Sequence, residues 1–360
     1  MTERNMERLQ LFRQRLQQAA RQPEKLQERC QISRAAAEEF PFMPEFRAEY
    51  AAVQATYFRY AAAVREMQSA LALPLPETSL FLQPVRRQAV RMLQRWQALA
   101  DQAAALRVTA CLIVRDEAER IRDWLRNVRI YSDAVVVVDT GSVDATRQIL
   151  QRAGIPVHGV PWQDHFAAAR NAALAQVSGG WIVFLDADEG FMHPQCIRGF
   201  LAQLSACQPG MEAVMLPVVS IDEDQGGREM QQRLNLRIFR STPELRYYGR
   251  VHEILQHEDG HPVRTAVADQ RLCVRHTGYS LSRVVQKNQR NLALLQKEIA
   301  EIGMQPRHYY YLANSYFILQ DYEQALYYAE LSMRYPVHMI GGEEDAHCWA
   351  EASRAMLAKR

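Results

Sequence analysis

The sequence predicts an α/β domain with a helical region on either side of it. Three observations support this fold class. Residues 1–105 carry apolar side chains at helical spacing, residues 106–283 alternate short β-prone runs with amphipathic segments, and residues 284–360 return to helical spacing. The chain has 360 residues, 48% hydrophobic and 23% charged, which is enough for two or three domains with sizeable cores. We therefore expect the N-terminal helical region, the α/β domain and the C-terminal helical domain to follow these three ranges.

The composition excludes several classes of protein. A formal net charge of +2 gives no general reason to expect nucleic acid or an anionic membrane as a partner. No apolar run is long enough to predict a transmembrane segment, and the first residues are charged rather than apolar as in a signal peptide. The six cysteines are scattered, without a C-x-x-C pair or the spacing of a zinc site. We expect a cytoplasmic protein with reduced thiols.

The N-terminal region contains long helical patterns but no catalytic motif. Apolar residues recur every three or four positions over residues 46–71, which is the period of an α-helix. Pro44 marks the start of this run and Pro74 its end, and a second run of the same kind follows Pro84. Packing between helices accounts for the aromatic residues of this region more simply than a bound partner does.

The central region begins with four β-prone runs separated by amphipathic segments. The strands are expected over residues 108–114, 134–138, 156–160 and 181–185, and the helices over residues 115–128, 144–153 and 166–177. This alternation is typical of a parallel sheet covered by helices on both faces. Less regular, strand-rich sequence follows up to residue 276.

The C-terminal region resembles a tetratricopeptide (TPR) repeat, a helix-turn-helix unit of 34 residues. Large and small residues follow the order of the repeat from Tyr309 to Ser332, and the closing proline, Pro336, stands one position early. One repeat cannot bury its own apolar face, so we expect helices over residues 284–302 and 343–358 to complete the stack. A structural or homodimer-forming role and an acceptor-binding role are both open for this region.

Acidic residues stand at the ends of two predicted strands. Asp139 ends the second strand, and Asp186-Ala187-Asp188 follows the fourth. Ligands of open α/β sheets bind beyond the carboxyl ends of the strands. Residues two apart in an extended chain point the same way, so Asp186 and Asp188 can face one ligand. A divalent cation bridging to a pyrophosphate, or sugar hydroxyls, would relieve the repulsion between them.

Seven motifs, taken together, resemble a family 2 glycosyltransferase of the GT-A fold. In chain order they are Ile113-Val114-Arg115-Asp116-Glu117, the segment 137–144 with Asp139-Thr140-Gly141-Ser142, Phe166-Ala167-Ala168-Ala169-Arg170-Asn171, the segment 184–189 with Asp186-Ala187-Asp188, and the segments 237–240, 248–253 and 275–280. The last three resemble the bacterial branch that carries C-terminal TPR-like helices and includes the sublancin-type S-glycosyltransferase. Val251-His252-Glu253 also resembles lipopolysaccharide-core glucosyltransferases. Asp116 departs from the family, which commonly has Asn there, and residues 1–105 match no family.

The resemblance implies that the first two strand ends hold the nucleotide of a sugar donor, a UDP-hexose. Asp139 would accept a hydrogen bond from the uracil N–H, and capping of the following helix is the alternative. Arg170 would lie beside the base or the diphosphate, and a surface position is the alternative. Asp186 would bind ribose hydroxyls or the outer shell of the metal. The other residues implied in nucleotide binding are Val114, Glu117, Gly141, Ser142 and Asn171.

The resemblance also implies a metal site and a general base. Asp188 and His276 are the expected ligands of Mn²⁺ or Mg²⁺, and Asp188 thereby takes part in catalysis; a hydrogen-bonded structural role is the alternative for His276. The acceptor must lose a proton as it attacks the sugar. We expect Glu253 to take that proton, and an ion pair with Arg250 or Arg246 is the alternative.

The sequence therefore predicts a metal-dependent, inverting glycosyltransferase that moves a sugar from a nucleotide sugar to a peptide, protein or glycan acceptor. The alternatives are a non-catalytic TPR-type interaction protein with a degenerate transferase domain and a transferase of lipopolysaccharide-core type. A sugar-phosphate nucleotidyltransferase would need a glycine-rich loop after the first strand, and residues 114–117 contain no glycine. The donor sugar and the acceptor atom stay open.

Overall fold

The computed structural model describes residues 2–222, 225–278, 281–336 and 342–359. Tyr279 and Ser280, which belong to one of the motifs above, lie outside the described residues. The chain forms two compact units, Met1–Leu106 with His193–Met211 and Arg107–Met192 with Glu212–Arg360. Within the described ranges, no helix combines the length and the apolar character needed to cross a bilayer.

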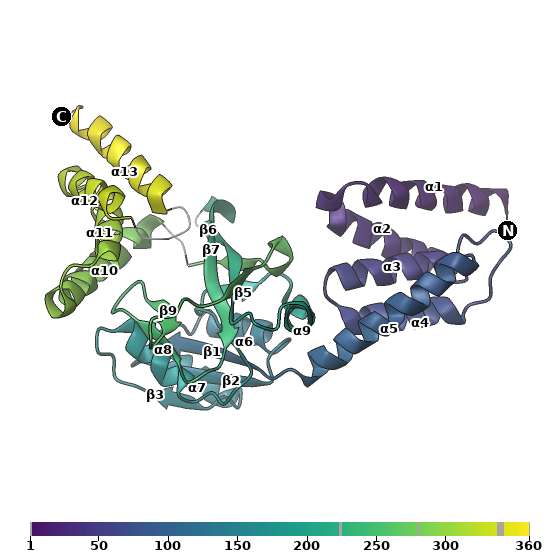
Figure 1. Ribbon diagram of the computed structural model, residues 1–360, viewed down its shortest axis with the longest axis horizontal. Coiled ribbons are helices and arrows are strands. Elements are labelled where there is room, and N and C mark those ends of the chain that lie inside the picture. The colour runs from purple at the N-terminus through teal and green to yellow at the C-terminus, as the bar shows by residue number, and fades with distance from the viewer. Residues whose placement is uncertain (1, 223–224, 279–280, 337–341, 360) are drawn as a thin grey trace. The chain divides into compact units, whose positions relative to one another are not determined.

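The described residues of the first unit form helices and turns, without a strand. Its elements are α1 (Glu3–Ala20), the 3₁₀ turn η1 (Pro23–Lys25), α2 (Leu26–Glu39), α3 (Pro44–Thr56), α4 (Tyr60–Ala72), α5 (Gln83–Ala105), η2 (Pro194–Cys196) and α9 (Ile197–Cys207). Each helix from α1 to α4 contacts the next one along the chain (Figure 1). Helix α9 contacts α5. Pro44 and Pro84 lie in the first turns of α3 and α5, where a missing N–H costs no hydrogen bond.

The helical run predicted over residues 46–71 is broken at Phe58, which separates α3 from α4. Phe58 has a φ of 58°, in the left-handed region that helices exclude. Its ring meets Phe200 of α9 edge-on, with the ring centroids 5.3 Å apart. A Cβ on Gly199 would lie 1.7 Å from the Phe58 carbonyl oxygen, so only glycine permits this approach. A tertiary contact therefore interrupts a run whose local spacing is helical throughout.

Arg198 attaches α9 to the end of α5. Its guanidinium donates to the backbone carbonyls of Ala103 (3.0 Å), Ala104 (3.2 Å) and Leu106 (2.6 Å). These carbonyls have no partner within α5, because the last turn of a helix leaves its C=O groups unpaired. Residues 193–211 thus pack with the N-terminal helices although they lie inside the range 106–283. The division into three regions stays a prediction.

Over the described residues, the second unit is built on a mixed sheet of nine strands. Its order is β3-β2-β1-β4-β7-β6-β11-β5, and β10 pairs with β6. The strands are β1 (Val108–Val114), β2 (Ala134–Asp139), β3 (Val157–Gly159), β4 (Trp181–Phe184), β5 (Glu189–Phe191), β6 (Ala213–Asp222), β7 (Arg228–Arg240), β10 (Thr265–Val267) and β11 (Val274–His276). The first four are parallel, whereas β7 runs antiparallel to both β4 and β6. The carboxyl ends of β1, β2 and β4 therefore meet at one edge of the sheet.

Helices and a separate hairpin cover this sheet. They are α6 (Ile121–Val128), α7 (Thr146–Arg152), α8 (Phe166–Leu174), the hairpin of β8 (Leu245–Tyr248) with β9 (Ile254–His257), and η4 (Gln270–Leu272). Helix α8 packs on β1, β2 and β8, and α6 packs on β5. The predicted helix over residues 115–128 begins only at Ile121. The preceding segment is a loop in which Asp116 has a φ of 56°.

After residue 280, the described part of the chain forms four helices: α10 (Leu281–Ile302), α11 (Pro306–Ile318), α12 (Tyr322–Arg334) and α13 (Gly342–Leu357). Consecutive helices contact each other, as in a TPR stack. Leu294, Leu295 and Leu312 share one apolar cluster with Val251 of the sheet domain. The predicted fold class, α/β with a helical region before and after it, is confirmed.

Candidate active site

The loop after β2 is organised by Asp139. The Asp139 side chain is 1% exposed, and its Oδ1 accepts hydrogen bonds from the backbone N–H groups of Gly141 and Ser142, both at 3.0 Å. Its Oδ2 is buried without a hydrogen-bond partner among the described residues. Helix α7 begins at Thr146, so Asp139 caps its own turn and not that helix. One buried carboxylate oxygen of Asp139 can thus accept a hydrogen bond from a group that the described residues do not supply.

Asp116 joins the loop after β1 to the loop after β2. Its Oδ1 accepts from the backbone N–H groups of Val143 (2.8 Å) and Asp144 (3.2 Å), and its own N–H donates to Ser142 Oγ (3.0 Å). A positive φ is tolerated best by Asn and Asp among residues with side chains. The departure from the family's Asn therefore keeps both the backbone conformation and the acceptor oxygen.

Val114 and Glu117 also lie at this edge. Val114 is buried, and its carbonyl accepts from the Thr140 N–H at 2.9 Å. The Glu117 N–H donates to Thr146 Oγ1 (2.8 Å), and the Glu117 carboxylate pairs with Arg120 (3.1 Å). Burial raises the pKa of Glu117, although Arg120 opposes this effect.

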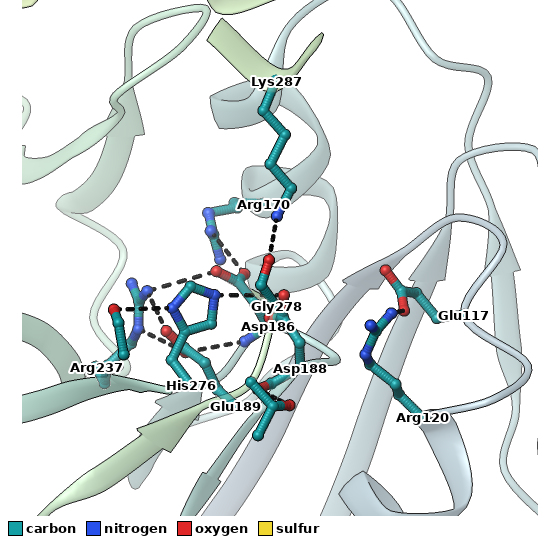
Figure 2. Close-up of polar contacts among 12 residues, drawn as sticks. Glu117, Arg120, Arg170, Asp186, Asp188, Glu189, Arg237, His276, Gly278 and Lys287 are labelled. Atoms are coloured by element: carbon teal, nitrogen blue, oxygen red, sulfur yellow. Dashed lines mark hydrogen bonds and ion pairs between the residues drawn. The ribbon is translucent and has the colours of Figure 1, made fainter. Parts of the chain in front are cut away.

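A cluster of alternating charges lies beneath the carboxyl end of β4, and we call it the arginine cluster: Arg170, Asp186, Glu189, Arg237 and Glu253. Asp186 lies between the two guanidinium groups, 3.0 Å from Arg170 and 3.4 Å from Arg237 (Figure 2). Arg237 also holds Glu189 with a fork of two hydrogen bonds, at 2.8 and 2.7 Å. Burial would raise the pKa of Asp186, but the two arginines hold it well below its usual range. Asp186 is therefore a neutralised anion.

Arg170 is the centre of this cluster. It is 6% exposed, its Nε donates to Glu253, and its guanidinium carbon lies 4.6 Å from the centre of the Phe184 ring. The alternative of a surface position for Arg170 is therefore wrong. The adjacent residue, Asn171, joins α8 to β8 by donating to the Tyr247 carbonyl (2.8 Å) and accepting from the Tyr247 N–H (2.9 Å).

Glu253 forms an ion pair, but not with either arginine named in the sequence alternative. Arg250 pairs with Glu301 of α10, and Arg246 donates to the backbone carbonyls of Thr242 and Leu245. Glu253 pairs with Arg170. The segment carrying Glu253 is also held by His252, whose ring stacks on Tyr311 of α11 with 4.0 Å between the centroids. Burial lowers the pKa of His252 to about 4, so that ring is neutral near pH 7.

Asp188 and His276 form a second arrangement, which we call the histidine pair. His276 Nε2 lies 3.3 Å from Asp188 Oδ2, and His276 Nδ1 lies 3.4 Å from Ser220 Oγ. Burial alone would raise the pKa of Asp188 and lower that of His276, but the attraction between them reverses both shifts. A Cβ on Gly278 would lie 1.6 Å from Asp188 Oδ2, so only glycine can pack this closely against the carboxylate. Figure 2 shows Gly278 directly beside Asp188.

Residues of the arginine cluster and both residues of the histidine pair line one cavity of about 860 Å³. Its lining includes seven of the predicted site residues: Val114, Glu117, Arg170, Asp186, Asp188, Glu253 and His276. Asp139, Gly141, Ser142 and Asn171 do not line it, although Thr140 does. Asp188 also lines a neighbouring cavity of about 680 Å³ with Arg120, Trp124 and Arg275.

The sequence motifs missed several residues of the site. Arg237 lies in a predicted motif, but nothing in its spacing indicated that it would reach Asp186 from the antiparallel strand β7. Glu189 follows Asp188 directly, and its burial beside Arg237 depends on the same strand pairing. Lys287 and Arg290 of α10 and Tyr311 of α11 line the main cavity as well. Only the three-dimensional placement of the C-terminal helices reveals them.

Comparisons with known proteins support this picture. The family model for glycosyl transferase family 2 matches residues 109–272. A TPR repeat-containing protein of Synechococcus elongatus is 35% identical over 190 residues, which are 51% of this chain and 45% of that protein. The SPbeta prophage-derived glycosyltransferase SunS of Bacillus subtilis is 25% identical over 233 residues, 63% of this chain and 53% of SunS. The chain thus spans about half the length of the curated relatives it matches.

A solved structure is also similar over part of the chain. Glucosyl-3-phosphoglycerate synthase from Mycobacterium tuberculosis, in complex with Mn²⁺ and uridine-diphosphate-glucose, is 23% identical and covers 33% of this chain and 46% of its own, with a TM-score of 0.29. A TM-score of this size does not establish a common arrangement of the two whole chains. The family match and the mixed sheet carry the conclusion: residues 109–272 match the model of glycosyl transferase family 2, and their sheet has the GT-A arrangement that the sequence motifs predict.

Proposed function

We propose that this protein is a metal-dependent, inverting glycosyltransferase that transfers a sugar from a UDP-sugar to a peptide, protein or glycan acceptor. The observation that carries the proposal is the histidine pair beside Gly278. A carboxylate and an imidazole, both side chains of the kind that bind divalent metals, meet at 3.3 Å on the wall of a cavity, and the glycine beside them has no side chain to displace the carboxylate. The arrangement fits a divalent cation that Asp188 and His276 bind together with the phosphate groups of a substrate.

The residues fit a divalent cation that takes most of its ligands from the substrate. Among the described residues, no group of three or more His, Cys, Asp or Glu side chains forms a complete metal cage. Mg²⁺ and Mn²⁺ are commonly held by one or two protein ligands, with phosphate oxygens and water filling the other positions. Asp188 and His276 would hold the ion. When bound, the ion would stabilise the charge that develops on the departing diphosphate.

Asp139 supports a pyrimidine base such as uracil in the donor. Its Oδ2 is buried and lacks a partner among the described residues, whereas Oδ1 is already used by the turn. A carboxylate oxygen is a good acceptor for the single ring N–H of uracil. Val114 and Glu117, which line the cavity, would wall the base. Asp186, held ionised by two arginines, would accept hydrogen bonds from the ribose hydroxyls.

Transfer requires one proton acceptor on the acceptor side of the cavity, and Glu253 is our candidate. The acceptor's oxygen or sulfur atom attacks the anomeric carbon, the bond from that carbon to the diphosphate oxygen breaks, and the diphosphate leaves with the electron pair. Glu253 takes the acceptor's proton. Its pairing with Arg170 orients the carboxylate.

Calorimetric titration of UDP tests the proposal. We expect Mn²⁺ to strengthen UDP binding to the wild-type protein by roughly tenfold or more over binding in EDTA, and Asp188→Ala and Gly278→Ala to remove this gain. Asp259→Ala is the matched control, because Asp259 also pairs with a histidine, His261, but does so on the surface with 66% of its side chain exposed. It should keep the full gain.

Two results would count against the proposal. UDP binding that is indifferent both to Mn²⁺ and to Asp188→Ala would remove the metal-dependent mechanism. Binding of UDP and Mn²⁺ without release of free sugar from any of a panel of UDP-sugars would instead favour the non-catalytic interaction protein. The panel would at the same time identify the donor sugar of an active enzyme.

A further inference from the structure

Helix α10 places two positive side chains in the wall of the main cavity. Lys287 and Arg290 are three residues apart and therefore lie on the same face of the helix. The helix is fixed to the catalytic domain: Glu301 pairs with Arg250, and Glu298 accepts a hydrogen bond from the Arg250 N–H. The two cations are consequently held in place by a packed element and not by a loose tail.

The acidic side chains that line the cavity have ion-pair partners other than Lys287. Of the acids that line it, Asp186 and Glu253 pair with Arg170. The other two are also paired, Glu117 with Arg120 and Asp188 with His276. Within the described ranges, no carboxylate oxygen lies within 4.0 Å of Lys287 Nζ. By contrast, Lys297 on the same helix pairs with Asp164. The positive charge of Lys287 thus faces the cavity and is not balanced by an ion pair with a described carboxylate.

The position of Lys287 indicates which ligand would use that charge. Its Nζ donates to the Gly278 carbonyl at 3.1 Å, and Gly278 is the residue that borders Asp188 Oδ2 (Figure 2). The ammonium is also close enough to act electrostatically on Asp188 and Glu117, which lie at the metal end and the nucleotide end of the cavity. Lys287 therefore stands beside the place where a diphosphate would have to lie between them.

The Arg290 side chain makes more contacts with the protein than Lys287 does. Its guanidinium lies over the Phe166 ring, 5.2 Å from the ring centre, and donates to Asn291 on its own helix. Lys287 makes only one hydrogen bond that the structure gives, to a backbone carbonyl, and an ammonium has three donors. Arg290 is therefore oriented by Phe166 and Asn291, whereas the ammonium of Lys287 has two donors without a partner among the described residues.

We propose that Lys287, from the C-terminal helical region, binds the phosphate of the nucleoside diphosphate that lies nearest Asp188 and stabilises it as the leaving group. This inference rests on the proposed function, since it names a further residue of the same donor site. It makes the TPR-like helices part of the catalytic pocket: α10 would supply a positive charge to the diphosphate in addition to the metal ion.

Calorimetry on the full-length protein tests this assignment with UDP and with uridine, each in EDTA and in Mn²⁺. We expect Lys287→Gln to weaken UDP binding roughly tenfold in EDTA and to leave uridine binding unchanged, because uridine has no phosphate. Lys287→Arg keeps the charge and should restore most of the affinity. Lys297→Gln is the matched control on the same helix and should bind UDP as the wild type does.

The outcomes separate this inference from the proposed function. If Lys287→Gln binds UDP as tightly as Lys297→Gln does, or loses uridine and UDP binding equally, Lys287 does not bind the diphosphate and the inference fails alone. If the wild-type protein binds neither UDP nor uridine in any of the conditions, the UDP-sugar donor and this inference fail together. Thermal unfolding of each variant shows whether it is folded, and Lys287→Arg supplies the test should Lys287→Gln unfold.

Discussion

The two carboxylates of Asp186-Ala187-Asp188 lie in opposite electrostatic surroundings. Asp186 belongs to the arginine cluster and is neutralised by two groups that stay charged at every accessible pH. Asp188 belongs to the histidine pair and is neutralised by one group that can lose its proton. Their spacing predicts two acids on one extended segment that face the same ligand, but Ala187 and Asp188 form a turn, closed by a hydrogen bond from the Glu189 N–H to the Asp186 carbonyl at 3.0 Å. The structure separates them into a permanent ion pair and an exchangeable one.

This difference has a consequence for ligand binding. A metal ion competes poorly for a carboxylate held by two arginines, because it must displace both guanidinium groups. It competes well for one held by a histidine, since loss of a single proton turns that histidine into a second ligand. The arginine cluster therefore suits a structural and hydrogen-bonding role, and the histidine pair suits a cation. Two of the following variants test this contrast: Arg170→Met removes a member of the arginine cluster, and His276→Gln removes a member of the histidine pair.

The largest effect is expected from Arg170→Met. Removing this buried guanidinium leaves Glu253 without its ion-pair partner and deprives Asp186 of one of two. Breaking a buried pair costs about 3 kcal/mol, because an uncompensated charge remains inside the protein. We expect the free energy of unfolding of the second unit to fall by about this amount, measured by urea denaturation.

Arg126→Ala is the control for Arg170→Met. Arg126 pairs with Asp123 on the surface, where the two side chains are 77% and 72% exposed. Exposed pairs contribute about 0.5 kcal/mol or less. If both variants lowered the stability equally, the arginine cluster would not be the permanent, buried pair that the comparison describes.

A smaller, pH-dependent effect is expected from His276→Gln. Pairing with Asp188 raises the pKa of His276 against the opposing effect of burial. The stability that this pair contributes is therefore fully present below the usual histidine pKa of about 6.5, and is lost as the pH rises through the raised value. The lowered pKa of Asp188 means that the contribution also disappears at strongly acid pH, below the usual range of an aspartate.

We expect the stability difference between wild type and His276→Gln, measured in EDTA, to be larger by about 1 kcal/mol at about pH 6 than at about pH 9. His261→Gln, which removes an exposed Asp–His pair, should show little such change. A stability difference for His276→Gln that is the same at both pH values would mean that His276 is not paired in its charged form. The contrast with the arginine cluster would then disappear.

The sequence predicted the features that depend on local order along the chain. The four parallel strands, the acids at their ends and the helices after residue 281 follow from periodicity and from the rule that strand ends gather at one edge. It did not predict features that depend on pairing across long separations. Arg237 reaches Asp186 because β7 inserts antiparallel beside β4, and Phe58 breaks a helix because α9 packs against it. Neither the β4–β7 pairing nor the contact of α9 with Phe58 can be predicted from the spacing of apolar residues nearby in the sequence.

The smallest effect is expected where the chain departs from its family, at Asp116. The loop uses one side-chain oxygen, Oδ1, to accept from the Val143 and Asp144 N–H groups, and an asparagine carries an equivalent oxygen and tolerates the same positive φ. Asp116→Asn should therefore change the free energy of unfolding by less than about 0.5 kcal/mol and leave UDP affinity unaltered. Asp116→Ala, which removes the acceptor, should cost about 1 kcal/mol in the same urea titration. If Asp116→Asn behaved like Asp116→Ala, the negative charge would matter in addition to the oxygen, and Asp116 would join Asp188 as a carboxylate whose charge this site requires.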